Sequence, residues 1–292
     1  MKQAFRSKLG LSNSNKRKLD TINNIIEEYR AQGYKLTLRQ LYYQLVSRDI
    51  IPNQQKEYAK LSVLLTKGRM AGYVDWDAIE DRIRVPFLPY WVTGIEDAVN
   101  DTVNQYRLNR MDGQEVYIEL WVEKDALSGV LKRVTSKYHI NLMVNRGYSS
   151  CSAMYDAYKR LGRQEEAGKK CVILYLGDHD PSGLDMIRDI QERLEEFGVS
   201  PEVRQIALTM EQIEKYNPPP NPAKVTDPRA GDYIARHGDT SWEVDALTPQ
   251  VLHALVKKNV EEMIDSDLFN EKIEQEEKDK ERLQEFADEV EE

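Results

Sequence analysis

The sequence lacks several features that mark common classes of protein. It has only two cysteines, Cys151 and Cys171, and no Cys-x-x-Cys pair, so neither a disulfide framework nor a structural zinc site is expected. No apolar run approaches the roughly 18 residues that span a membrane. The N-terminal stretch MKQAFRSKLGLSNSNKRK has no apolar segment typical of a secretory signal. We therefore expect a cytoplasmic protein with no membrane partner.

The charge is unevenly distributed along the 292 residues, whose net charge is −9. Residues 1–48 hold ten Lys or Arg against three acids, a balance of +7, whereas residues 271–292 hold eleven acids against four bases, a balance of −7. A basic head on an acidic protein indicates an anionic partner, and duplex DNA in the nucleoid is the candidate we favour. A solvated N-terminal helix would give the same charge pattern.

The N-terminal third has the periodicity of three short helices, at about 15–32, 37–48 and 55–70. Thr37 and Gln40 have the spacing of a capping box. The segment YVDWDAIEDRIRV, from residue 73, is predicted to form a hairpin or wing. This order is typical of a winged helix, which places a helix in the DNA major groove, although a simple helical bundle fits as well. The basic residues outside the apolar stripe of the third helix are the predicted DNA contacts: Lys56, Lys60, Lys67 and Arg69.

From residue 115 the pattern changes to strand and helix in alternation, β-α-β-α-β-α-β, which predicts an α/β domain with a parallel sheet. The proline-rich stretch 217–232 is predicted to be an irregular loop. We therefore divide the chain into four parts: an N-terminal winged-helix (CAP-like) domain, a connecting helix, an α/β domain, and a C-terminal helix with an acidic tail. Their predicted ranges are 1–93, 94–114, 115–247 and 248–292.

Three acidic residues follow predicted strands of the α/β domain. Glu123 ends the first strand, in ELWVEKDALSG, and Asp178 and Asp180 follow the third, in CVILYLGDHDPSG. The first and third strands of a right-handed parallel sheet can be neighbours, so the three carboxylates are predicted to converge on an all-oxygen site for Mg²⁺ or Mn²⁺. The four histidines show no zinc-binding spacing. The alternative for the Asp pair is that it caps the next helix.

These motifs together resemble a known family. VEKDAL, GDHDPSG and the upstream TLRQLYY are similar to the Toprim domain and winged helix of the topoisomerase VI A subunit and its meiotic double-strand-break relatives. The resemblance covers roughly residues 35–250 and implies a winged helix followed by a Toprim (Rossmann-like) domain. WEVDAL, at 242–247, also resembles an acidic segment late in that family, so Glu243 or Asp245 is a further candidate metal ligand.

The resemblance also implies roles for individual residues. Tyr43 would attack a DNA phosphate, Arg39 would stabilise the phenolate or clamp the phosphate, and Glu123 and Asp178 would act with the metal ion. The family works as a homodimer in which the tyrosine of one subunit meets the metal site of the other, and a topoisomerase requires a separate ATPase subunit. Helix geometry places Tyr42 in the core and Tyr43 beside Arg39.

Several readings stay open on sequence grounds. Tyr43 can be an ordinary aromatic on a helix flank, in which case cleavage would use water as the nucleophile. A phosphatase of the haloacid dehalogenase type also places Asp-x-Asp after a strand, but that family has Thr or Val two residues after the second Asp, where this chain has Ser182. A DNA-binding accessory protein without catalytic activity is the third reading.

Overall fold

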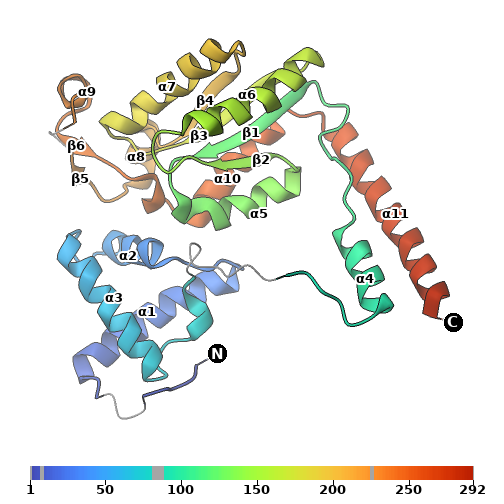
Figure 1. The fold of residues 1–292 in the computed structure, drawn as a ribbon. Helices are drawn as coiled ribbons and strands as arrows, with labels where there is room; N and C mark the ends of the chain where they lie inside the picture. Colours follow the sequence, from blue (N-terminus) through green and yellow to red (C-terminus); the bar gives the residue numbers. More distant parts are fainter. Residues whose placement is uncertain (1, 7–9, 81–88, 224–226, 292) are drawn as a thin grey trace.

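A computed structural model describes residues 2–6, 10–80, 89–223 and 227–291. These residues form a helical N-terminal unit, an α/β unit above it in Figure 1, and a pair of helices to one side. The predicted α/β class is therefore confirmed, with a four-stranded parallel sheet at its centre. In the described part of the chain, no helix combines the length and apolarity needed to cross a membrane.

The N-terminal unit consists of three helices packed on a common core. They are α1 (Asn13–Ala31), α2 (Leu38–Ser47) and α3 (Gln55–Met70). The predicted capping box begins α2, since Thr37 accepts from the Gln40 backbone N–H and the Gln40 side chain accepts from the Thr37 N–H. The core is formed by apolar side chains repeating at helical spacing, among them Leu19, Ile22, Ile26, Leu41, Leu45, Leu61 and Leu65.

The predicted wing is only partly described. Residues 73–80 contain a 3₁₀ turn, η1 (Trp76–Ala78), and a single isolated bridge between Leu36 and Ile79 rather than a hairpin. The rest of the wing segment, from residue 81, lies outside the described residues. Asp75 caps this turn by accepting from the Asp77 N–H and also binds Arg30 of α1, so the turn is held against the helices.

The sheet of the α/β unit has the order β2-β1-β3-β4, with every pair parallel. Its strands are β1 (Val116–Val122), β2 (Asn141–Val144), β3 (Lys170–Leu176) and β4 (Glu202–Ala207). The predicted alternation of strands and helices is confirmed, and β1 and β3 are direct neighbours. β1 and β3 are buried on both faces, which explains their nearly continuous runs of apolar residues.

Helices cover both faces of the sheet, as Figure 1 shows. Even-numbered residues of β1, such as Leu120, pack with α5 (Ser128–Tyr138) and α10 (Pro249–Glu261). Odd-numbered residues, such as Trp121, pack with α6 (Cys151–Glu166) and α7 (Pro181–Phe197). Helix α10 contributes Leu252 and Val256 to the core on the α5 face of the sheet, so the α/β unit extends beyond its predicted end at residue 247.

The segment between β4 and α10 is more regular than predicted. After α8 (Met210–Tyr216), the proline-rich stretch includes a two-residue strand, β5 (Asn221–Pro222), which pairs with β6 (Thr240–Ser241). Helix α9 (Ala230–His237) also begins inside the stretch predicted to be irregular. Proline fits at β5 because this short strand lies at an edge and needs no further ladder bond. The turn η3 (Val244–Ala246) follows β6 and packs against α2.

Two helices form an arm beside the α/β unit. Helix α4 (Ile95–Gln105) is shorter than the connecting helix predicted at 94–114, and α11 (Ser266–Glu291) carries the acidic tail as one long helix. Tyr106 binds Asp279, whereas the Leu108 N–H donates to Glu276. The two segments therefore run antiparallel, and Figure 1 shows that they extend away from the sheet.

Candidate active site at the strand ends

The carboxyl ends of β1 and β3 bring two of the predicted residues into contact. Glu123 directly follows β1, and its Oε2 accepts a hydrogen bond from the Asp178 backbone N–H at 3.0 Å. The Glu123 N–H in turn donates to the Leu176 carbonyl at 2.9 Å. The proximity arises from strand pairing, because parallel strands end at the same edge of a sheet.

Asp178 is buried and bound on both carboxylate oxygens. Its Oδ1 accepts from the Val244 N–H at 2.8 Å, and its Oδ2 lies 2.7 Å from the Lys124 ammonium. Burial, together with the carboxylates of Glu123 and Asp245, raises the pKa of Asp178 to about 8, although Lys124 opposes this rise. Acidic groups outnumber cations around it, so Asp178 retains a proton more easily than an exposed aspartate does.

Asp180 caps the helix that follows. Its Oδ1 accepts from the Gly183 N–H at 2.6 Å and from the Ser182 hydroxyl at 3.3 Å, at the start of α7. Residue 183 must be glycine, since a Cβ there would lie 2.2 Å from the Asp178 carbonyl oxygen. The capping interpretation is therefore correct for Asp180, but not for Asp178.

All three acids nevertheless act electrostatically on one buried side chain. Tyr175 of β3 is fully buried, and burial followed by the charges of Glu123, Asp178 and Asp180 raises its pKa. Oxygen donors of this kind suit Mg²⁺ or Mn²⁺. In the conformation described for residues 2–6, 10–80, 89–223 and 227–291, no three acidic, histidine or cysteine side chains are placed so that they could hold a metal ion. The oxygen donors of Glu123, Asp178 and Asp180 thus suit a divalent metal ion by their chemistry. In the described conformation, however, these carboxylates bind groups of the protein itself, and a metal ion would have to compete with those bonds.

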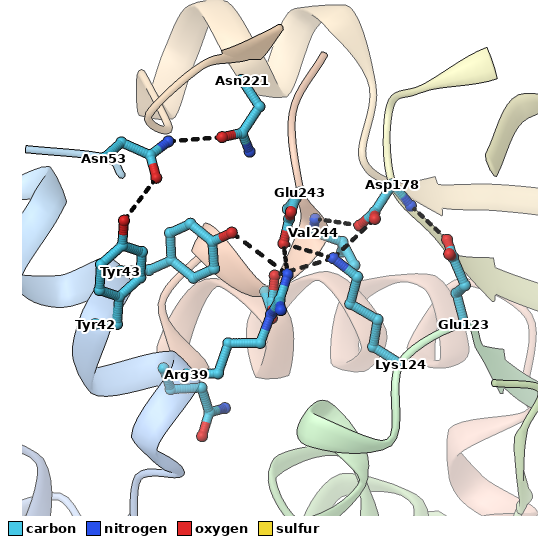
Figure 2. Close-up of polar contacts among 12 residues, drawn as sticks. Arg39, Tyr42, Tyr43, Asn53, Glu123, Lys124, Asp178, Asn221, Glu243 and Val244 are labelled. Carbon is cyan, nitrogen blue, oxygen red and sulfur yellow. Dashed lines mark hydrogen bonds and ion pairs between the residues drawn. The ribbon is translucent and has the colours of Figure 1, made fainter. Parts of the chain in front are cut away.

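Lys124 is the centre of a second set of carboxylates, shown in Figure 2. Besides Asp178, its ammonium lies 2.9 Å from Glu243 Oε2 and 3.2 Å from Asp245 Oδ1. Burial alone would raise the pKa of Glu243, but Lys124, the Tyr43 hydroxyl and Arg39 outweigh it and lower this pKa to about 2. Glu243 and Asp245, considered above as metal ligands, therefore bind cationic side chains here.

Arg39 of α2 completes this cluster from the N-terminal unit. Its Nε lies 2.6 Å from Asp245 Oδ2, and its guanidinium also pairs with Glu243. Asp245 is fully buried, whereas the Arg39 side chain is 41% exposed, so the pair is shielded from water on its carboxylate side only. Arg39, Glu243, Lys124 and Asp178 thus form a continuous polar network across the contact between the two units (Figure 2).

Tyr43 lies at the edge of the same network, beside Arg39 as predicted. Arg39 Nη2 is 3.5 Å from the Tyr43 hydroxyl, and the guanidinium carbon is 5.6 Å from the ring centre. Tyr43 is only 4% exposed, and burial followed by the charges of Asp245 and Glu243 raises its pKa, whereas Arg39 lowers it. Tyr42 is buried as predicted, and its hydroxyl binds Asn53. The acids nearest to Tyr43 thus belong to its own chain, and they disfavour its ionised form.

The predicted DNA contacts of α3 have different surroundings. Lys56, Lys60 and Lys67 are exposed, and Lys60 pairs with Glu57 at 2.7 Å. Arg69 is turned inward, which corrects its assignment as a surface contact, because its guanidinium donates to the carbonyls of Trp76 and Ile79. It therefore fastens the turn η1 to α3 instead of facing solvent.

No protein-family model matches the chain, and neither the curated proteins nor the solved structures contain a significant match to it. The likeness to Toprim proteins therefore stays a prediction from the motifs quoted above. Sequence reasoning missed Lys124 as a residue of the site. Its position was a usable signal, because Lys124 lies in the quoted motif VEKDAL and directly follows Glu123 at a strand end.

Proposed function

We propose that the protein binds duplex DNA and cleaves a phosphodiester bond in a reaction that requires Mg²⁺ or Mn²⁺. One observation supports this most directly: the Tyr43 hydroxyl and the strand-end carboxylates of Glu123 and Asp178 lie around one polar network that joins the two units. Exposed lysines on α3 supply positive charge for the DNA backbone.

Each residue would have a distinct task in this reaction. Glu123, Asp178 and Asp180 would hold the metal ion, which would neutralise charge developing on the phosphate. The Tyr43 oxygen would attack phosphorus after losing its proton, forming a tyrosyl–phosphate bond. The bond from phosphorus to the 3′ oxygen of the neighbouring deoxyribose would break, and that oxygen would take up a proton. Arg39 would favour the phenolate, because it lowers the pKa of Tyr43.

In the described conformation, burial and the charges of Asp245 and Glu243 raise the pKa of Tyr43 and so disfavour its ionised form. The proposed attack by Tyr43 would therefore be favoured by a separation of α2 from residues 243–245. The same burial favours a second candidate, in which the metal site activates water and hydrolyses the bond directly.

Incubation with supercoiled plasmid and Mg²⁺ or Mn²⁺ tests the proposed activity. Asp178→Ala should lower the cleavage rate roughly 100-fold or more, since a metal ligand contributes several kcal/mol to the transition state. Asp156→Ala, at an exposed site on α6, is the matched control and should cut normally. If Asp178→Ala cuts like the wild type, the proposed site is wrong, and duplex binding without cleavage by the wild type would indicate an accessory protein.

A Tyr43→Phe variant separates the covalent route from hydrolysis. We expect it to lose cleavage and the 5′-phosphotyrosyl adduct, while its stability falls by only about 1–3 kcal/mol, because the buried hydroxyl gives up its contacts with the charged Arg39 and Glu243. Denaturing gels detect the adduct, because DNA that is covalently bound to protein enters the gel only after proteolysis. Continued cleavage by Tyr43→Phe would assign the reaction to water.

A further inference from the structure

The N-terminal unit carries an apolar groove with a basic rim. The groove has a volume of about 620 Å³ and lies between α1, α3 and the loop after α2. Leu45, Ile50, Ile51, Val63 and Leu64 are among its apolar lining residues, and Arg17, Lys18, Lys60 and Lys67 stand around it. Ile50 is 42% exposed and Val63 is 55% exposed, so this apolar surface is open to solvent.

The arm of α4 and α11 carries apolar side chains that nothing in the described chain covers. Helix α4 buries no residue, and Trp91 and Ile95 before and at its start are 75% and 72% exposed. Phe286, near the end of α11, is 61% exposed. Since residues 108 and 106 meet residues 276 and 279 in antiparallel order, the start of α4 and the end of α11 both lie toward the far end of the arm. We call this end the arm tip.

The arm tip and the groove have opposite charge. Exposed acids surround the apolar residues of the tip, namely Glu96, Asp97, Glu281, Glu285 and Asp288, and they outnumber the neighbouring bases Lys278 and Arg282. The groove presents four bases against Glu57, which is itself paired with Lys60. Apolar centres with complementary rims are the usual anatomy of a specific interface. In one copy of the chain the arm projects away from the N-terminal unit, as Figure 1 shows.

We propose that the arm tip of one copy docks into the groove of a second copy, with Trp91, Ile95 and Phe286 entering the apolar centre. The exchange is reciprocal, so it forms a closed dimer with two equivalent contacts instead of a filament. An aromatic side chain can bury roughly 150–250 Å². Trp91 and Phe286 in two contacts therefore bury on the order of 600–1,000 Å², which approaches the roughly 1,000 Å² of a specific interface. This inference does not depend on the proposed cleavage activity, but a docked arm tip would cover Lys60 and Lys67 and so compete with DNA for these two lysines.

Sedimentation velocity of the full-length chain over a range of concentrations tests the proposal. We expect a dimer whose dissociation constant rises with ionic strength, because charged rims are screened by salt. Phe286→Asp and Val63→Asp each damage both equivalent contacts, so each should raise that constant roughly 1,000-fold, which is about 30-fold for each lost hot spot. Tyr155→Asp replaces another exposed aromatic residue, on α6, and should leave the dimer intact.

Mixing the two damaging variants gives the sharpest discrimination. Phe286→Asp keeps an intact groove and Val63→Asp keeps an intact tip, so the mixture should form a heterodimer through one contact although each variant alone is monomeric. A Lys60→Glu/Lys67→Glu variant tests the basic rim of the groove without placing charge in the apolar centre, and it should also raise the dissociation constant of the dimer. Circular dichroism verifies that each variant folds. A wild type that stays monomeric, or a dimer that Val63→Asp leaves intact, would overturn the proposal.

Discussion

Lys124 shows how much a single side chain decides at this site. Its ammonium is within 3.2 Å of three carboxylates from two distant parts of the chain, and its own side chain is only 17% exposed. Removing one partner from a buried ionic cluster leaves uncompensated charge, which is more costly than losing a surface pair. Lys124 is therefore the residue on which the contact between β1, β3 and η3 depends most.

We predict that Lys124→Met lowers the free energy of unfolding by about 3–5 kcal/mol. Lys272→Met removes a surface pair with Asp112 and is the matched control, with an expected loss below about 1 kcal/mol. Urea unfolding at pH 7 measures both. Equal losses for the two variants would show that the Lys124 cluster contributes no more than an exposed ion pair.

For individual residues, the contacts that depend on local spacing could be predicted from the sequence, whereas the contacts between distant residues could not. Tyr43 beside Arg39 and the Thr37–Gln40 cap follow from helix geometry, and both are present. The pairing of Arg39 with Asp245 joins residues 206 positions apart, and no periodicity relates them. Arg69 was misassigned because its partners are carbonyl groups of a turn, which a pattern of side chains does not reveal.

At the scale of elements, the attachment of α11 depends on one buried acid. Glu276 is 1% exposed and accepts hydrogen bonds from the Leu108 N–H, Arg110 and Lys280. Burial alone would raise the pKa of Glu276, but Lys280, Arg110 and the Leu108 N–H lower it to about 2. Its ionised form therefore stabilises the junction between α11 and the segment before β1.

This shift predicts a pH dependence with a definite sign. Because the pKa of Glu276 is lower in the folded state than in the unfolded chain, its contribution is present above about pH 4.3 and is lost as the pH falls toward 2. Glu276→Gln should therefore cost roughly 3 kcal/mol at pH 7 and much less near pH 2. Urea unfolding of both proteins across this range gives the difference directly.

Glu271→Gln removes an exposed acid from the same helix and is the control, with little effect expected at either pH. A destabilisation by Glu276→Gln that is the same at pH 7 and pH 3 would contradict the charge-based explanation. It would indicate that shape alone, and not ionisation, holds α11 in place.

The elements themselves were largely predictable. Buried parallel strands and amphipathic helices have clear periods, and the sequence located all four strands of the sheet. It also allowed β1 and β3 to be neighbours, as they are, because right-handed crossovers leave few arrangements. The strand β5 and helix α9 were missed, since prolines in Asn217–Asp232 mask a two-residue strand and a short helix that depend on tertiary contacts.

At the scale of the whole molecule, the two units share a charged contact that holds Tyr43 against Glu243 and Asp245. Of the strand-end acids, Asp178 pairs with Lys124 in the same network, and Glu123 accepts from the Asp178 N–H. Binding of a divalent cation by Glu123, Asp178 and Asp180 would compete with Lys124 for Asp178. The central claim of the proposed function is that these three carboxylates hold one such cation.

Titration with Mn²⁺, followed by electron paramagnetic resonance of the free ion, tests that claim most directly. Glu123→Gln is the variant of choice, because its side-chain oxygen can still accept from the Asp178 N–H. Glu192→Gln, on the exposed surface of α7, is the control. We predict that Glu123→Gln binds Mn²⁺ at least about tenfold more weakly than the wild type and the control, corresponding to about 1.4 kcal/mol. Equal Mn²⁺ affinity in all three proteins would contradict the account.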